Sequence, residues 1–164
     1  MLVPRTLLAP LAFLLSAPLV AASVQPRVDP LLFFQGRTET VGTVNVMFHR
    51  AYHTRSIGEG RIEPDGSLVL VQRVQDDGKP PTQRWWHVRK IAPNQFIATM
   101  SEAVGPVTIE KIGEQYRFRF KLKGNLSAEQ LLTPLPGGRA ALSKVRVTSM
   151  GVTVASTDGI VRKI

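Results

Sequence analysis

Hydrophobic and polar residues alternate along short segments of the chain from about residue 36 onward. The clearest example runs from Tyr116 to Lys123, where Tyr116, Phe118, Phe120 and Leu122 alternate with basic residues. Side chains alternate between the two faces of a β-strand, so this segment predicts a strand with an apolar inner face and a basic outer face. Similar patterns predict strands over residues 36–48, 53–63, 67–75, 83–91, 95–101, 107–112, 116–123, 144–150, 152–156 and 159–163.

The links between these segments are short and rich in turn-forming residues. Pro64, Asp65 and Gly66 form a strong hairpin signal, because proline presets its φ angle and glycine accepts a left-handed conformation. Such short links make neighbouring strands antiparallel, since parallel strands need long crossovers. A meander with one buried face hides that face by closing. We therefore predict an all-β fold, a lipocalin-like antiparallel barrel of about 8–10 strands. A two-sheet sandwich is the alternative.

One stretch, residues 124–143, departs from the alternation. Ser127 and Gln130 match the spacing of a helix capping box, and Pro134 would end a helix that began there. The sequence therefore predicts a short helix or loop insertion near 125–140, which covers one mouth of the barrel or packs outside it. With this insertion, residues 33–164 form a single barrel domain.

The first 22 residues have the pattern of an export signal. Arg5 precedes an apolar run, and Val20 and Ala22 stand where signal peptidase requires small residues. A membrane anchor is the alternative, but Pro10 and Pro18 break the run short of the roughly 20 apolar residues that a span needs. We expect cleavage near Ala22, a linker over residues 23–32, and a mature chain without a transmembrane span in the periplasm.

Composition narrows the classes of function. The 164 residues contain no cysteine, which excludes disulfides, thiolate metal sites, thiol nucleophiles and a lipidated cysteine. The formal net charge is +9. An exported protein with this charge meets anionic lipid headgroups or wall polymers rather than nucleic acid, so we expect an anionic envelope surface as a partner and no nucleic acid.

The histidines indicate no metal site. His49 and His53 are four residues apart, but the context is a strand, and Arg50 and Arg55 repel a metal ion. No serine lies in a Gly-x-Ser-x-Gly elbow. We therefore predict no catalytic residue, no metal and no cofactor. An enzyme on this scaffold would depend on His87 or Glu102 as its acid–base group.

Two adjacent tryptophans are the most informative aromatic residues. On a strand, Trp85 and Trp86 point to opposite faces, and Trp86 shares its face with Val88. The inner ring either fills the core or forms the wall of an apolar cavity. For the second interpretation, the predicted ligand-binding residues are Trp86, Val88, Tyr116, Phe118 and Phe120. Arg84, beside this pair, is expected to help close one end of the barrel.

The outer face of the 116–123 strand forms a basic stripe. Its residues are Arg117, Arg119, Lys121 and Lys123. The stripe is either a solvated outer surface or a contact for anionic lipid or polymer.

Several short motifs resemble those of a known family. Phe-x-Gly-Arg stands at residues 34–37, Arg-x-Trp at residues 84–86, and Gly151 lies in a terminal strand pair. This arrangement resembles a family of bacterial envelope proteins, often lipoproteins, that carries a domain of unknown function. The resemblance implies a lipocalin-like, calycin-type barrel and an envelope location, and it carries over no catalytic residue.

These observations lead to three functional hypotheses. The first is an exported, non-enzymatic barrel that binds an apolar or amphiphilic small molecule, such as a lipid. The second is an interaction or structural module of the envelope that uses the basic outer face. The third is an enzyme on a calycin scaffold.

Overall fold

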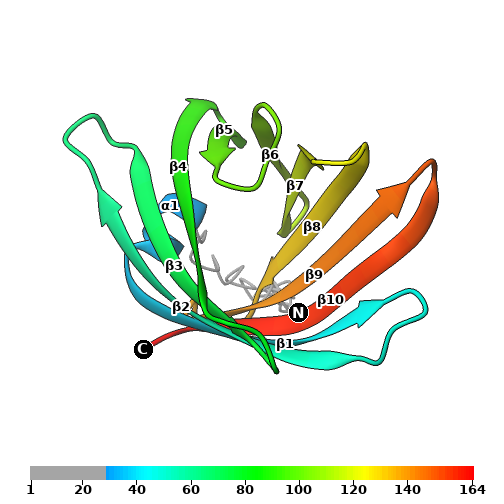
Figure 1. Cartoon of the computed structure of the whole chain (residues 1–164). Coiled ribbons are helices and arrows are strands. Elements are labelled where there is room, and N and C mark those ends of the chain that lie inside the picture. The colour runs from blue at the N-terminus through cyan, green and yellow to red at the C-terminus, as the bar shows by residue number, and fades with distance from the viewer. Residues whose placement is uncertain (1–28) are drawn as a thin grey trace, which may run out of the picture.

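A computed structural model describes residues 29–164, which form a closed antiparallel barrel (Figure 1). The strands of these residues are β1 (Gly36–Val46), β2 (Tyr52–Ile62), β3 (Leu68–Asp76), β4 (Thr82–Ala92), β5 (Gln95–Met100), β6 (Val107–Ile112), β7 (Gln115–Leu122), β8 (Leu126–Pro134), β9 (Ala140–Ser149) and β10 (Val152–Lys163). Each strand pairs with the next along the chain, as expected for a meander. The predicted lipocalin-like barrel is confirmed, with ten strands.

The barrel closes where the first and last strands meet. β1 pairs with β10 from Thr38↔Lys163 to Val46↔Ala155, so neither strand is left with a free edge. At the middle of this seam Gly42 faces Gly159, and a Cβ built on Gly42 would lie 2.8 Å from the Asp158 carbonyl oxygen. The two glycines therefore let the strands approach closely. Closure excludes the two-sheet sandwich.

A short helix, α1 (Pro30–Phe34), covers one end of the barrel beside β2 and β3 (Figure 1). Asp29 caps the helix by accepting a hydrogen bond from the Leu31 amide at 2.9 Å, and proline occupies its first turn. Leu31 and Phe33 are buried in the core. In the described part of the chain, no helix has the length and hydropathy that a membrane crossing needs.

The helix predicted near 125–140 is wrong. This stretch instead forms β8 and the start of β9, which pair from Leu126↔Ser149 to Pro134↔Ala141. The Ser127 hydroxyl accepts a hydrogen bond from Lys121 on the neighbouring β7 and caps nothing. The physical reason is long-range: without these strands β7 would have an open edge, and edge pairing outweighs a weak local capping signal.

Two further boundaries differ from the sequence prediction. Residues 30–32 belong to α1 rather than to a linker, and Phe33 and Phe34 complete this helix. The two strands predicted over 152–156 and 159–163 are one continuous strand, β10. The first seven predicted strands match β1–β7 with ends that differ by at most two residues. Residues 1–22, the predicted signal, and most of the predicted linker lie outside the described residues.

The packed core occupies the half of the barrel nearest α1. Its most fully buried large side chains are Leu68, Val107, Ile109 and Leu132, which come from β3, β6 and β8. The other half of the interior carries polar and charged side chains as well as apolar ones. The interior is therefore filled at one end and open at the other.

Candidate ligand-binding site

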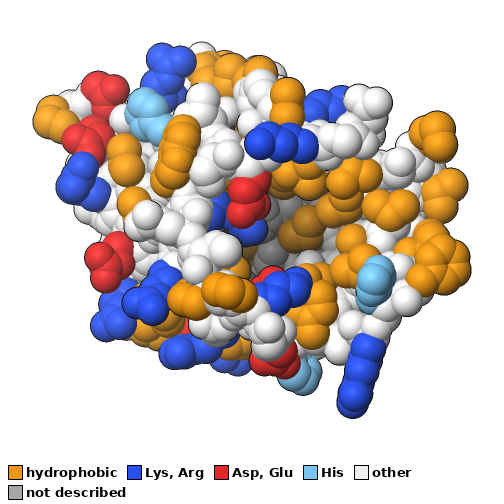
Figure 2. Space-filling view, viewed as in Figure 1, with side chains coloured by type: hydrophobic (Ala, Val, Ile, Leu, Met, Phe, Trp, Pro, Cys, Tyr) orange, Lys and Arg blue, Asp and Glu red, His pale blue; other side chains and the backbone are white. Residues whose placement is uncertain are grey.

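A cavity of about 370 Å³ begins at the open end of the barrel and reaches inward to α1. Pro30 and Phe34 of α1 line its inner end, and strands from the whole circumference form its wall. Figure 2 shows the hollow, with charged side chains at its edge and hydrophobic side chains over β7–β10 to one side of it. The volume lies in the range of small-molecule pockets, roughly 300–1,000 Å³.

Aromatic side chains form the deeper wall on one side. The Trp86 ring, on β4, meets Phe118 and Phe120 of β7 edge to face, with ring centroids 6.3 and 6.2 Å apart. Such edge-on contacts hold the rings in defined orientations. Val88, Met100 and several valines of β9 and β10 extend the apolar lining. This wall favours an apolar ligand group.

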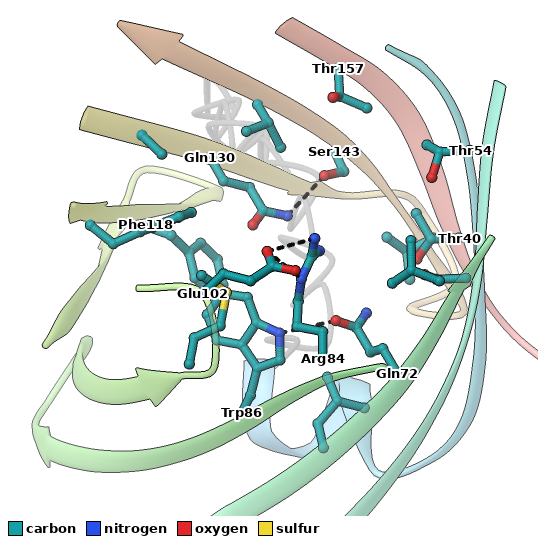
Figure 3. Close-up of a pocket in the computed structure, with 18 of the residues that line it drawn as sticks. Thr40, Thr54, Gln72, Arg84, Trp86, Glu102, Phe118, Gln130, Ser143 and Thr157 are labelled. Carbon is teal, nitrogen blue, oxygen red and sulfur yellow. Dashed lines mark hydrogen bonds and ion pairs between the residues drawn. The ribbon is translucent and has the colours of Figure 1, made fainter. Parts of the chain in front are cut away.

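An ion pair between Arg84 and Glu102 lies at the mouth of the cavity (Figure 3). Arg84 on β4 donates from Nε to Glu102 Oε2 at 3.0 Å, and its Nη2 lies 2.9 Å from the same oxygen. Both side chains are partly exposed, and pairs of this kind contribute only about 0–1 kcal/mol. An anionic ligand group can therefore replace Glu102 as the partner of Arg84 at little cost.

Amides and hydroxyls lie between the aromatic wall and the mouth. The Trp86 Nε1 donates to Gln72 Oε1 at 3.0 Å, and Gln130 Nε2 donates to the Ser143 hydroxyl at 2.9 Å (Figure 3). Thr40, Thr54 and Thr157 add hydroxyls on the opposite wall. These groups hold the aromatic and amide side chains in place and offer polar contacts to a ligand.

The structure separates the predicted ligand-binding residues into two groups. Trp86, Val88, Phe118 and Phe120 line the cavity. Tyr116 lies deeper in the packed core, where its ring meets Phe96 with centroids 6.3 Å apart. Four of the five predicted residues are thus brought together on one wall. Whether they contact a ligand stays a prediction.

The pKa of Tyr116 gives a test of this burial. Burial in the core raises the pKa above the ordinary value of 10.0, and the charges of Asp29 and Glu114 raise it further. The folded chain therefore keeps the phenolic proton at a pH where the unfolded chain has lost it, so stability falls as pH rises above about 10. We expect an absorbance titration of the Tyr52→Phe variant to show ionisation above the ordinary value. Ionisation at 10 or below would contradict the burial of this ring.

Residues that a polar interior requires were missed by the sequence reasoning. Gln72 is not among the predicted residues, and Gln130 is predicted only as part of a helix cap. Glu102 is predicted only as an acid–base group, and Arg84 as a residue that closes one end of the barrel. A signal was available, because Gln72 shares strand parity with Leu70, and Arg84 with Trp86. A polar residue at an inward position among apolar ones indicates an interior that is accessible to water. For Gln130 the mistaken helix hid this parity.

The two acid–base candidates lie on opposite sides of the barrel wall. His87 points outward, and its Nε2 lies 2.9 Å from the Ser67 hydroxyl. Glu102 faces the cavity and is paired with Arg84. The structure therefore does not assemble them into one site. Among residues 29–164, no three histidine, aspartate or glutamate side chains gather as metal ligands would.

The basic stripe lies outside, as its parity predicted, but neighbouring strands compensate part of its charge. Arg117 donates to Glu110 on β6 at 2.9 Å, and Arg119 donates to Glu129 on β8 at 3.3 Å. Lys121 bonds a neutral hydroxyl, that of Ser127 at 2.7 Å. The charge of the stripe is thus least compensated at its mouth end, at Lys121 and beyond it at Lys123. Contact between the stripe and an anionic surface stays a prediction.

Comparison with known proteins supports the fold. No family model matches the chain, and no curated protein matches it. Among solved structures, an S-type phycobiliprotein lyase from Guillardia theta superposes with a TM-score of 0.62 at 9% identity, covering 82% of this chain and 90% of the lyase. The structure of EF1p2_mFAP2b bound to DFHBI has a TM-score of 0.47 at 8% identity, and covers 85% and 99% of the two chains. At such low identity the first likeness shows a shared barrel architecture and nothing about activity.

Proposed function

We propose that this protein is a non-enzymatic carrier that binds an amphiphilic small molecule inside its barrel. The observation that supports it is the arrangement of the cavity, with an aromatic wall in its depth and the Arg84–Glu102 pair at its mouth. An apolar chain or ring would lie against Trp86, and a polar head would remain at the entrance. Pockets that bind small molecules combine such apolar walls with a few placed polar groups.

The mouth favours an anionic head. The Arg84 guanidinium presents planar N–H donors that match a carboxylate, sulfonate or phosphate, and its present partner Glu102 is itself a carboxylate. A ligand with such a head would displace Glu102 and take over the hydrogen bonds. A cationic head would instead meet Glu102 and leave Arg84 without its partner.

We further propose that the protein works outside the cytoplasm, in the bacterial envelope. The support is the sequence of residues 1–22, with Arg5 before an apolar run and small residues near Ala22. The test is the mass of the protein recovered from the periplasm of its host. A mature chain that begins at Ser23 is expected, and recovery of the intact chain from the cytoplasm would contradict export.

Ligand binding is tested by titration of the chain from Ser23 onward with decanoate, an anionic amphiphile. The readout is quenching of Trp86 fluorescence in the Trp85→Phe variant, which leaves one tryptophan on the cavity wall. We expect saturable quenching, and about tenfold or greater weakening in the Arg84→Met variant, because a hydrogen bond to a charged group contributes about 1.5–3 kcal/mol. Glu102→Gln is expected to tighten binding, since it removes the competing carboxylate.

The matched control is Arg89→Met, on the same strand but exposed on the outer face. It removes the same charge from the protein without touching the cavity, so it should leave decanoate binding unchanged. Equal effects of Arg84→Met and Arg89→Met would show that only net charge matters. Absence of quenching, together with an unchanged apo mass in native mass spectrometry after incubation with host lipid extract, would overturn the carrier proposal.

A further inference from the structure

Large hydrophobic side chains project from the open end of the barrel. Phe48 and Met150 are each 97% exposed, and Met47 and Val152 beside them are also exposed. We refer to these four residues as the apolar rim. Single exposed hydrophobic residues are common, but a group at one end of a molecule indicates an interaction site.

The hairpins that carry the apolar rim lie side by side. The Met47 amide donates to the Val154 carbonyl at 2.9 Å, which joins the tip of β1–β2 to the β9–β10 hairpin. Ser149 pairs with Leu126, which places the β7–β8 tip on the other side of β9–β10. Figure 1 shows these tips on one side of the barrel, away from α1. The rim is therefore a continuous edge of the cavity mouth.

The backbone conformation at the two most exposed residues of the rim disfavours bulky side chains. Phe48 has φ of 64° and Met150 has φ of 47°, in the left-handed region where glycine and asparagine are favoured. A bulky side chain is strained in this conformation. Burial of the side chain does not offset this strain at either residue, because each side chain is almost wholly exposed. Neither packing nor turn geometry therefore explains why these two positions carry hydrophobic residues. Backbone outliers of this kind point to function.

The charge around the rim has one sign. The tips at residues 46–52, 122–126 and 149–152 contain Arg50 and Lys123 and no aspartate or glutamate. The acidic residues of the mouth lie outside these tips, and each forms an ion pair or a hydrogen bond. Asp76 lies 3.2 Å from Lys79, Asp77 accepts from the His53 amide, and Glu102 pairs with Arg84. The rim therefore presents apolar tips flanked by free cations, on a protein of net charge +9.

We propose that the apolar rim inserts into the interface of a bilayer that contains anionic phospholipid, so that the cavity mouth faces the membrane. Apolar side chains enter the headgroup boundary while neighbouring basic residues bind the anionic headgroups. This geometry would let an amphiphile pass between bilayer and cavity without crossing water. The binding step itself does not depend on whether the cavity holds a ligand.

The test is flotation of the chain from Ser23 onward with lipid vesicles. The described residues contain every strand of the closed barrel, so this chain retains the fold and lacks the apolar segment that would itself bind lipid. We expect binding to vesicles of phosphatidylcholine and phosphatidylglycerol, and much weaker binding to phosphatidylcholine alone. Binding should also fall in about 1 M salt, where the Debye length is about 3 Å.

The rim variant is Phe48→Asn with Met150→Asn. Asparagine tolerates the left-handed conformation, so this variant is expected to be at least as stable as the original chain, and lost binding cannot be assigned to unfolding. We expect its vesicle affinity to fall about tenfold or more, because the variant lacks the two hydrophobic side chains that would enter the apolar phase of the membrane. The matched control, Ile91→Thr with Ile112→Thr, removes exposed hydrophobic residues at the α1 end and should not change binding.

Two charge-reversal variants complete the test. Arg50→Glu with Lys123→Glu is expected to weaken binding more than Arg89→Glu with Lys90→Glu, although both change the net charge equally, because only the first pair lies at the rim. Equal losses in the two charge variants, or unchanged binding in the rim variant, would overturn the proposal. So would a dimer that dissociates on Phe48→Asn substitution without any vesicle binding, because the rim would then be a contact between two copies.

Discussion

Replacing Trp86 with alanine is expected to lower the free energy of unfolding by about 3 kcal/mol or more, as measured by urea denaturation followed by circular dichroism. Its side chain is only 8% exposed, and its ring contacts Phe118 and Phe120. The substitution also leaves Gln72 Oε1 without its indole donor. Because the ring already borders a cavity, its loss enlarges an open space that the neighbouring strands cannot close.

The adjacent tryptophan provides a control of the same residue type. Trp85 is 48% exposed on the outer face, where it stands opposite Val71. We expect Trp85→Ala to cost less than about 1 kcal/mol, since partly exposed outer residues contribute little to stability. Equal losses from the two substitutions would contradict the inward orientation of Trp86. If decanoate binds in the cavity, it should also stabilise the original chain more than the Trp86→Ala variant.

The second large loss of stability is expected from a substitution at Gly60, where α1 meets β2. A Cβ on this residue would lie 1.8 Å from the carbonyl oxygen of Phe34, an overlap that no side-chain adjustment relieves. Gly60→Ala therefore forces α1 away from the end of the barrel. This exposes Leu31 and Phe33, each of which contributes about 1.5–3 kcal/mol by burial, so the loss of stability is expected to be about 3–6 kcal/mol.

Gly66→Ala is the control for this substitution. Gly66 has φ of 81° and no heavy atom within 4 Å of a built Cβ, so alanine there suffers only backbone strain, about 1 kcal/mol. Tyr116 reports on α1 directly, because burial and the charge of Asp29 both raise its pKa. In Gly60→Ala this pKa should move back toward the ordinary value. An unchanged Tyr116 titration would show that α1 stays in place.

Local alternation was sufficient to predict most of the strands. The side chains of β7 alternate without interruption, so the pattern predicted both its extent and its inner face. The helix wrongly predicted in place of β8 also follows from local alternation, which is weak in this segment. Gln130 and Ser127 are polar on either face of the strand, so alternation was weak and a capping pattern looked stronger. Only the unpaired edges of β7 and β9 decide that this segment is a strand.

The cavity was predictable in its apolar wall but not in its polar mouth. Trp86, Val88 and Phe118 lie on inward positions of strands that the alternation identified. Arg84 also lies on an inward position, but the sequence predicted only that it helps to close one end of the barrel. Its partner there is Glu102, which comes from the loop after β5 and is 18 residues away along the chain. Sequence alone does not show which loop carboxylate reaches which strand.

By itself, the sequence determined that the protein is an antiparallel all-β meander, because side-chain alternation and turn residues are local properties of the chain. It also determined which aromatic face turns inward. The tertiary structure alone decided that β1 meets β10, that α1 fills one end while the other stays open, and that hydrophobic tips surround that opening. These features depend on how many strands close the barrel and on what enters it, which no short segment records.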